Sequence, residues 1–298
     1  MIKFERHIAI TSDNSNIIGE LERACNEFSL SRTLLKEAIN KGALWLARGK
    51  YTQRIRKVKK PLLQGDTLHF YFDEKVLNQQ PPQALLIADL EGYSVWCKPY
   101  GMLSQGSKWS DHCTIARWAE TTLTPQRPAF IVHRLDRAAS GLIIIAHSKK
   151  IAQAFSHIFE HHQLEKNYQI IVHGKFPATV DLDNGQIIST DIDGKKAKST
   201  FYPQEYNADN NLTLVKVIIE TGRKHQIRKH AASIGMPVVG DRLHGDPANI
   251  LPEPINLQLC AVQLGFICPI TQQKSQFELP VQLTLSLTEL TKYINKSF

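Results

Sequence analysis

Hydrophobic residues near the start of the chain follow a helical period. Apolar positions over residues 17–28 recur every three or four residues, which predicts a helix. The same period appears over residues 34–39, where Ser29 or Ser31 supplies a side-chain oxygen to cap a second helix. Gly42 is suited to end that helix, because glycine adopts the left-handed backbone conformation common at helix ends. The pattern therefore predicts two short helices in succession.

Short apolar runs on either side of these helices are typical of strands. They predict a leading strand over residues 2–11 and two later strands over residues 43–46 and 68–72. The two later strands are expected to be joined through Gly49 and a basic run. Residues 77–84 are polar, contain two prolines and have little to bury, which predicts a linker between domains.

The linker divides the chain into two predicted domains, a small basic α/β domain over residues 1–76 and a larger domain over residues 85–298. Helices and strands mix irregularly in the larger one: strands are expected over residues 142–146, 168–173 and 212–220, a helix over 152–159, and a closing segment from 280. Irregular mixing without repeated strand–helix–strand units predicts an α+β fold with a mixed, largely antiparallel sheet.

Positive charge is concentrated in one short segment. Residues 31–60 hold ten lysines and arginines against one acid, Glu37, although the net charge of the whole chain is only +8. Such concentration indicates a polyanion-binding surface, and nucleic acid is favoured over a membrane because no amphipathic apolar face accompanies the charges. The candidate RNA-binding side chains are Arg32, Lys36, Arg54, Arg56, Lys57, Lys59 and Lys60.

Composition excludes several other classes of protein. No apolar run approaches the roughly 20 residues of a membrane span, and the N-terminus lacks the apolar core of a secretory signal. Five cysteines, with no Cys-x-x-Cys pair, indicate free thiols in a reducing cytoplasmic compartment. The twelve histidines show no second ligand pair at metal-binding spacing, so no metal site is expected.

A carboxylate lies between two arginines just before the strand over residues 142–146. Asp136 is flanked by Arg134 and Arg137 and follows His133. Charge at the mouth of a buried strand is costly unless it is paired or used. An aspartate held by arginine stays ionised at neutral pH, which suits a nucleophile or a general base. Taken alone, the motif is equally consistent with a structural ion pair that caps the strand.

A second motif follows the strand over residues 212–220. It is predicted to be a turn running into a helix, with Thr221 as its cap and Gly222 allowing a close backbone approach. Three basic side chains are predicted to share one face of this helix: His225, Arg228 and Lys229. A solvated basic face is the commoner fate of such residues. On a rigid strand-to-helix junction, however, they are placed to hold an anion, either a phosphate or a carboxylate.

Together these motifs resemble signature segments of the RluA-type pseudouridine synthases. Matching segments follow in the family's order: Lys98-Pro99-Tyr100-Gly101, His133-Arg134-Leu135-Asp136 with Ser140-Gly141, Glu165-Lys166-Asn167-Tyr168, Gly194-Lys195-Lys196-Ala197 with Thr200, Gly222-Arg223 with His225-Gln226-Ile227-Arg228, and Val238-Val239-Gly240-Asp241. The resemblance covers residues 85–285. More weakly, residues 16–75 resemble the RNA-binding domain of the ribosomal-protein-S-four type, in which Ser31-Arg32 and Gly65-Asp66 match.

The resemblance implies isomerisation of uridine in RNA to pseudouridine, a redox-neutral reaction for which no cofactor is expected. It implies that Asp136 is the essential carboxylate, which either attacks the ribose anomeric carbon or takes the 2′ proton, with Arg228 keeping it ionised. Tyr168 is expected to stack on the target base and to remove the proton from carbon 5. The remaining candidates for binding substrate are Arg134, His133, Leu259, Lys166, Arg223, His225 and Gln226.

The expected partner is structured RNA, with ribosomal RNA favoured over transfer RNA, and neither DNA nor a membrane. We expect a monomer. The target base must leave the RNA stack to be reached, and Arg134 is suited to fill the space it vacates. A simple ion pair explains Arg134 equally well.

Two other functions compete with this interpretation. Ala139 stands where the family usually has Thr, and Cys260 where it usually has His, which favours a non-catalytic RNA-binding or assembly protein of the same fold. Retention of Asp136, Tyr168 and Arg228 argues against it. A carboxylate-based hydrolase would need a second acid close to Asp136. The two motif segments contain none, so this alternative ranks last.

Overall fold

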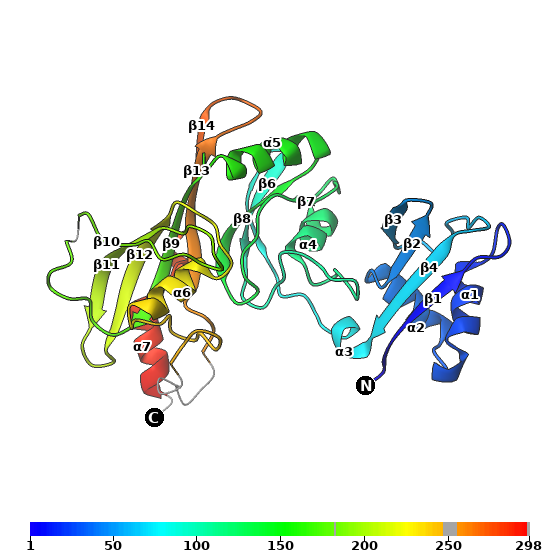
Figure 1. Cartoon of the computed structure of the whole chain (residues 1–298), viewed down its shortest axis with the longest axis horizontal. Helices are drawn as coiled ribbons and strands as arrows, with labels where there is room; N and C mark the ends of the chain where they lie inside the picture. The colour runs from blue at the N-terminus through cyan, green and yellow to red at the C-terminus, as the bar shows by residue number, and fades with distance from the viewer. Residues whose placement is uncertain (182, 247–254, 297–298) are drawn as a thin grey trace. The chain divides into compact units, whose positions relative to one another are not determined.

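The computed structural model describes residues 1–181, 183–246 and 255–296. Its chain divides into two compact units (Figure 1), residues 1–81 with 105–118 (the N-terminal unit) and residues 82–104 with 119–298 (the large unit). The sequence pattern did not predict that segment 105–118 groups with the N-terminal unit. Within the described residues, no helix is long and apolar enough to cross a bilayer.

The N-terminal unit is a four-stranded antiparallel sheet with short helices. Its elements are β1 (Lys3–Ala9), α1 (Ile17–Ala24), the 3₁₀ turn Asn26–Phe28, α2 (Arg32–Asn40), β2 (Leu44–Arg48), β3 (Tyr51–Ile55), β4 (Thr67–Asp73) and α3 (Glu74–Leu77). The strands pair in the order β1-β4-β2-β3. Asn16 and Ser31 cap α1 and α2 through their side chains, so of the two predicted caps for the second helix Ser31 is the correct one.

Strand β3 lies within the basic run that the sequence assigned only to a connection. Four of its five residues stay exposed or half-exposed and only Ile55 is buried, so no alternation of apolar and polar positions marked it. The predicted first helix also ends early, because α1 stops at Ala24 and residues 26–28 form a 3₁₀ turn.

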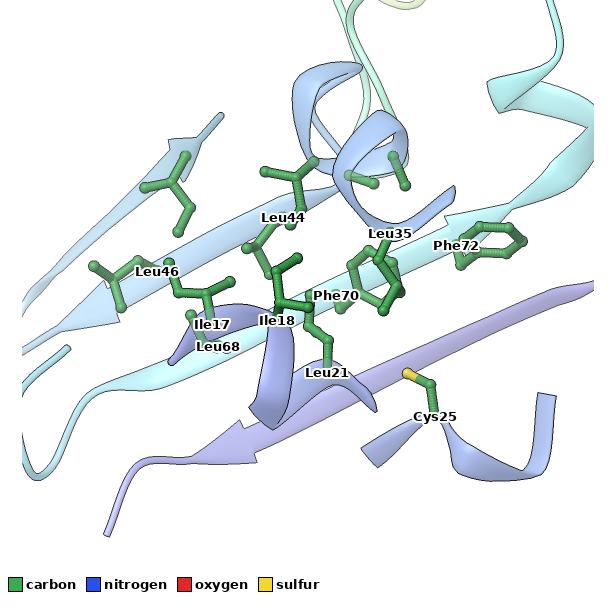
Figure 2. Close-up of a cluster of buried hydrophobic side chains, with 14 of the residues drawn as sticks. Ile17, Ile18, Leu21, Cys25, Leu35, Leu44, Leu46, Leu68, Phe70 and Phe72 are labelled. Carbon is green, nitrogen blue, oxygen red and sulfur yellow. The ribbon is translucent and has the colours of Figure 1, made fainter. Parts of the chain in front are cut away.

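The core of the N-terminal unit lies between its helices and one face of the sheet (Figure 2). Alternate residues of β2 and β4 point toward the helices, as the two-residue period of a strand requires. Fully buried members include Ile17, Leu21, Leu35, Leu44, Leu46, Leu68 and Phe70. Each such side chain contributes about 1.5–3 kcal/mol by leaving water.

Segment 105–118 contacts the opposite face of the same sheet. Trp45 Nε1 donates to the backbone oxygen of Lys108 at 3.0 Å. The rings of Tyr71 and Trp109 meet edge to face with centroids 5.9 Å apart. Arg56 pairs with Asp111. The face of β2 and β4 that points away from the helices is therefore partly covered by this segment.

The large unit is built on a ten-stranded sheet. Its elements are β5 (Leu85–Asp89), β6 (Tyr93–Lys98), α4 (Ile115–Thr122, which begins in segment 105–118), β7 (Phe130–Ile131), β8 (Ser140–Ala146), α5 (Lys149–Glu160), β9 (Glu165–His173), β10 (Gln186–Ile188), β11 (Ser199–Asn207), β12 (Leu212–Ile219), α6 (Gln226–Ser233), β13 (Leu259–Ile267), β14 (Lys274–Glu278), the 3₁₀ turn Val281–Leu283 and α7 (Leu287–Lys296). Neighbouring strands of the sheet follow the order β10-β11-β12-β9-β13-β8-β6-β5. In addition, β14 pairs with β13, and β7 pairs with β8. Among the strands of the described residues, only β8 and β13 pair in parallel, which confirms the predicted α+β fold with a mixed, largely antiparallel sheet.

The parallel contact between β8 and β13 depends on a glycine. Gly141 has φ +110°, and a Cβ there would lie 2.3 Å from the oxygen and 2.4 Å from the nitrogen of Ala261. A side chain at this position would push the two strands apart. Because Asp136 precedes β8 and Leu259 begins β13, this close approach fixes the spacing between two walls of the cavity described next.

Candidate active site

A cavity of about 600 Å³ opens in the large unit where the two sequence motifs meet. Its volume is in the range typical of small-molecule sites. Its lining includes every catalytic and substrate-binding candidate of the large unit: His133, Arg134, Asp136, Lys166, Tyr168, Arg223, His225, Gln226, Arg228 and Leu259. Asp136 and Arg228, which are 92 residues apart in the sequence, thus come together at one site.

Asp136 presents its carboxylate to this cavity with a side-chain nitrogen near each oxygen. Arg228 Nη1 lies 3.3 Å from Oδ2, and His225 Nε2 lies 3.8 Å from Oδ1. The Asp136 side chain is 22 % exposed, so it is accessible from the cavity. An accessible carboxylate with a guanidinium beside it can act as a nucleophile or as a base.

Arg228 binds a second carboxylate more tightly than it binds Asp136. Its Nε and Nη2 donate to Asp241 Oδ2 and Oδ1 at 2.7 and 2.5 Å, and both side chains are almost fully buried. Burial alone would raise the pKa of Asp241, but hydrogen bonds from Arg228 and the backbone lower it. Burial alone would lower the pKa of Arg228, but pairing with Asp241 and Asp136 raises it. The guanidinium is thereby held rigidly beside Asp136.

The argument that no second carboxylate lies near Asp136 was therefore wrong. Asp241 shares Arg228 with it, although the two residues are far apart in the sequence. Both Asp241 oxygens accept hydrogen bonds from Arg228, and Oδ1 also accepts from the backbone nitrogens of Leu243 and His244. With its side chain 1 % exposed, Asp241 cannot serve as the free second acid of a hydrolase.

The apolar part of the cavity comes from the centre of the sheet. Tyr168 on β9 and Leu259 on β13 are both buried. Burial, reinforced by the negative charge of Asp136, raises the pKa of Tyr168, so its phenol is neutral at physiological pH. Lys166 lies with its Nζ 5.6 Å from the centre of the Phe159 ring, and burial lowers its pKa.

Gln226 and Arg223 make their main contacts within the protein. Gln226 Oε1 accepts from Thr221 Oγ1 and the Arg223 backbone nitrogen. Its Nε2 donates to Lys198 O and Ser199 Oγ. Gln226 therefore joins the start of α6 to β11 while it also lines the cavity, and its substrate-binding role stays a prediction. Arg223 Nε donates to a backbone oxygen at 3.0 Å, while Arg134 is exposed beside the cavity.

The start of α6 differs from the prediction. Its N-cap is His225, with φ 57° and no side-chain cap, because the Thr221 hydroxyl is used by Gln226 instead. Gly222 is not required for a close approach, since an added Cβ would meet only Lys166 Nζ at 3.7 Å. Lys229 pairs with Asp193, so it does not join the other two basic residues at Asp136.

The loop that carries Asp136 is anchored on both sides by residues that sequence reasoning did not assign to the site. Ser104 Oγ donates to Leu135 O at 2.7 Å and accepts from Leu135 N at 3.0 Å. Lys98, fully buried, donates to Ala139 O at 2.6 Å and to two further backbone oxygens. Burial lowers the pKa of Lys98 to about 8, although Asp136 opposes the shift. The family-like turn at Lys98 was the available signal; nothing marked Ser104.

His133 has a structural role in this loop. Its Nε2 accepts a hydrogen bond from the backbone nitrogen of Ile144 at 2.9 Å, and its ring stacks on Phe159. Burial, with the nearby charge of Lys166, lowers its pKa to about 3. His133 is therefore neutral, and its acceptor nitrogen is already used inside the protein.

His133 is expected to make the fold acid-sensitive. Unfolded histidine binds a proton near pH 6.5, whereas folded His133 resists protonation down to about pH 3, so stability falls as pH drops between these values. Urea unfolding of wild type at pH 7 and pH 5 should show this loss, and His133→Gln should lose less stability over the same interval. The exposed His161→Gln is the control and should behave as wild type. An equal pH dependence of the free energy of unfolding in all three proteins would contradict the assignment of the acid sensitivity to His133.

The basic candidates of the N-terminal unit separate into two groups. Arg32, Lys36, Lys59 and Lys60 line a cavity of about 630 Å³, together with residues 14–16 before α1. Arg32 also pairs with Glu22 at 2.6 Å. The other three candidates do not line it: Arg54, Arg56 and Lys57.

Arg54 and Arg56 are engaged elsewhere in the N-terminal unit. Both contact Asp111, and Arg54 also donates to backbone oxygens of Gly42 and Ser107. Since their guanidinium groups are half-buried on protein acceptors, we leave them out of the proposed RNA surface. Lys57 is exposed outside the cavity.

Comparison with known proteins agrees with this geometry. The family model described as RNA pseudouridylate synthase matches residues 92–233. The chain is 34 % identical to the dual-specificity RNA pseudouridine synthase RluA of Pasteurella multocida, over 50 % of this chain and 71 % of that protein. It is 32 % identical to a tRNA pseudouridine synthase C of Vibrio cholerae, over 59 % of this chain and 82 % of that protein.

A human structure, RNA pseudouridylate synthase domain containing 1, shares the fold. Its TM-score is 0.55 at 18 % identity, covering 73 % of this chain and 98 % of that one. Fold and sequence together define an RNA pseudouridine synthase. The chain belongs to the RluA-type family of these enzymes, and it isomerises uridine in RNA.

Proposed function

We propose that this enzyme converts a uridine of structured ribosomal RNA to pseudouridine with Asp136 as the essential carboxylate. The observation that carries this proposal is the accessible Asp136 carboxylate, with Arg228 at 3.3 Å, in the same cavity as Tyr168 and Leu259. In this proposal the flat uracil base lies against the apolar side chains of Tyr168 and Leu259, and its ribose lies beside Asp136.

The chemistry needs an ionised carboxylate at the sugar. The bond from uracil nitrogen to the anomeric carbon breaks, the base turns, and carbon 5 forms the new bond. Asp136 either attacks the anomeric carbon, forming an ester bond that breaks when carbon 5 displaces the carboxylate, or removes the 2′ proton and returns it after carbon 5 has bonded. Arg228 stabilises the negative charge of the free carboxylate in both cases. Loss of the proton from carbon 5 then restores the conjugated ring.

Tyr168 is proposed to hold the base and to relay that last proton. Because its pKa is raised, the neutral phenol is the resting form, and it stacks on the base as an uncharged ring. Its hydroxyl oxygen takes the carbon-5 proton while passing its own proton to water, so the phenol is regenerated. Arg134, exposed beside the cavity, is proposed to fill the stack that the base leaves.

Transfer RNA is the second candidate substrate, because relatives such as the Vibrio cholerae protein are named tRNA pseudouridine synthase C. Ribosomal RNA is favoured by the small basic N-terminal unit. Incubation with each RNA pool, labelled with tritium at carbon 5 of uridine, separates the two. Release from ribosomal RNA alone is expected; release from transfer RNA alone would favour the second candidate, and release from neither would contradict the proposal.

The basic cavity of the N-terminal unit is proposed to bind RNA phosphates. Lys59→Gln with Lys60→Gln should lower the slope of log affinity against log salt by about two, roughly one per lost phosphate contact. Turnover at saturating RNA should stay unchanged, since neither residue lines the Asp136 cavity. Lys75→Gln, an exposed lysine of the same unit outside the basic cavity, is the matched control. An unchanged slope in the double variant would exclude this surface.

A further inference from the structure

Two histidines form a bonded pair beside Asp136. His225 Nδ1 lies 2.9 Å from His244 Nε2, and the rings meet at 67° with centroids 5.1 Å apart. The other ring nitrogen of His225, Nε2, faces Asp136 Oδ1 at 3.8 Å. The three side chains therefore form a row, from His244 through His225 to the carboxylate.

His244 is itself held in place through its backbone. Its nitrogen donates to Asp241 Oδ1 at 3.0 Å, and Asp241 carries the buried pair with Arg228. His225 is fixed at the N-cap of α6 in a left-handed conformation. The pair thus joins the start of α6, which carries Arg228, to the loop that carries Asp241, which makes its geometry well defined.

When both rings are neutral, one arrangement of protons gives a favourable contact at each step from His244 through His225 to Asp136. If His225 Nδ1 carried the proton and donated to His244, the lone pair of Nε2 would face the Asp136 carboxylate, which is repulsive. If His244 Nε2 carries the proton and donates to His225 Nδ1, then His225 Nε2 carries a proton directed at Asp136. A hydrogen bond at one imidazole nitrogen sets which nitrogen of that ring is protonated.

Burial, helped by nearby cations, favours the neutral form of both rings. Burial lowers the pKa of His225, and the cations Arg228 and Lys224 add to this, while Asp136 opposes it. Burial also lowers the pKa of His244. The groups that face His244 are Asp241, Arg228, Lys229, Asp136 and His225.

We propose that His244 is a positioning residue that fixes the Nε2-protonated tautomer of His225, so that His225 and Arg228 each direct a donor at one oxygen of Asp136. This inference rests on the proposed role of Asp136. With Oδ2 facing Arg228 and Oδ1 facing His225, the carboxylate plane is restrained from turning. The 3.8 Å separation is longer than a hydrogen bond, as catalytic contacts often are before substrate binds.

Three variants test the pairing. His244→Phe keeps an aromatic ring and removes the donor, whereas His244→Gln keeps an N–H donor. Leu243→Ala is the control, because that side chain is 69 % exposed in the same loop. His244→Phe should lower kcat about 10-fold with KM for RNA unchanged, the scale expected for loss of an outer orienting partner. His244→Gln should recover most of that loss, and Leu243→Ala should match wild type.

The pH dependence of kcat distinguishes a positioning role of His244 from a role in packing alone. Protonated His225 carries hydrogens on both nitrogens, so the deficit in kcat of His244→Phe relative to wild type should shrink as pH falls and His225 becomes protonated. A deficit that is constant with pH, or a Gln variant as impaired as Phe, would overturn the proposal.

Nitrogen-15 NMR of the His225 ring tests the tautomer without any turnover. Wild type and His244→Gln should show Nε2–H, and His244→Phe should show a mixture of tautomers. An Nδ1–H tautomer in wild type would overturn the inference even if Asp136 proves essential. Conversely, turnover in an Asp136 variant would overturn the proposed function while leaving the NMR result intact.

Discussion

Asp136→Ala is expected to abolish uridine isomerisation while leaving RNA affinity close to that of wild type. The rate of a single turnover should fall at least roughly 10³-fold, the scale of losing an essential nucleophile or base. Affinity should persist because the substitution leaves the exposed cationic residues proposed to bind RNA unchanged. Counting pseudouridine after nucleoside chromatography, alongside filter binding of the same RNA, measures both quantities.

Asp136→Asn is the matched control for this prediction. It keeps the size of the side chain and an oxygen for Arg228, and it removes only the charge and the nucleophile. Stability should change little in either variant, because Arg228 keeps its closer partner Asp241. An Asn variant that turns over within tenfold of wild type, or an Ala variant that no longer binds RNA, would contradict the assigned role.

Asp241→Ala is expected to destabilise the large unit by about 3–5 kcal/mol. The substitution leaves Arg228 as a buried charge without its bidentate partner, and breaking a buried pair costs this much. Activity should fall as well, since the guanidinium beside Asp136 loses its anchor. Urea unfolding at pH 7 measures the stability. Glu289→Ala, which breaks the exposed pair with Lys292, should cost no more than about 1 kcal/mol.

The cost of Asp241→Ala should also depend on pH. The folded pKa of Asp241 is lowered, so its contribution is fully present above the unfolded value of about 3.9 and is lost as pH falls through the folded value. The stability gap between wild type and variant should therefore narrow in strong acid. A gap below 1 kcal/mol at pH 7, or one that does not narrow, would show that the pair is not held as described.

The local pattern of apolar and polar residues was enough to predict many of the helices and strands. The strand, turn and helix around residues 212–233 followed from apolar alternation and a basic helical face, and β12 and α6 lie there. Strand β3 was not predicted, because Ile55 is its one buried residue and its sequence therefore shows neither the helical nor the strand period of apolar residues. The contact of segment 105–118 with the N-terminal sheet was not predicted either, because packing between segments distant in sequence produces no periodic pattern of residues.

The site residues that local sequence marks were predicted, and those defined by distant contacts were missed. Asp136 and Arg228 were marked by charge beside strands, and the structure brings them together. His244 and Ser104 were not marked, and Asp241 was marked only as part of a family-like segment with no role, because what matters about each is a contact made across at least 13 residues of chain. The hydrogen bonds that Gln226 makes to Lys198 and Ser199 could not be predicted either, because a motif does not show contacts with a distant segment.

The most direct test of the account compares wild type and Asp136→Ala on total RNA labelled with tritium at carbon 5 of uridine. Tritium leaves carbon 5 only when the base is rejoined to the ribose through that atom. Release by wild type alone is the predicted result, and mapping the product then names the modified uridine. Equal release by both proteins, or none by wild type with salt-sensitive RNA binding intact, would contradict an Asp136-dependent isomerisation in this cavity.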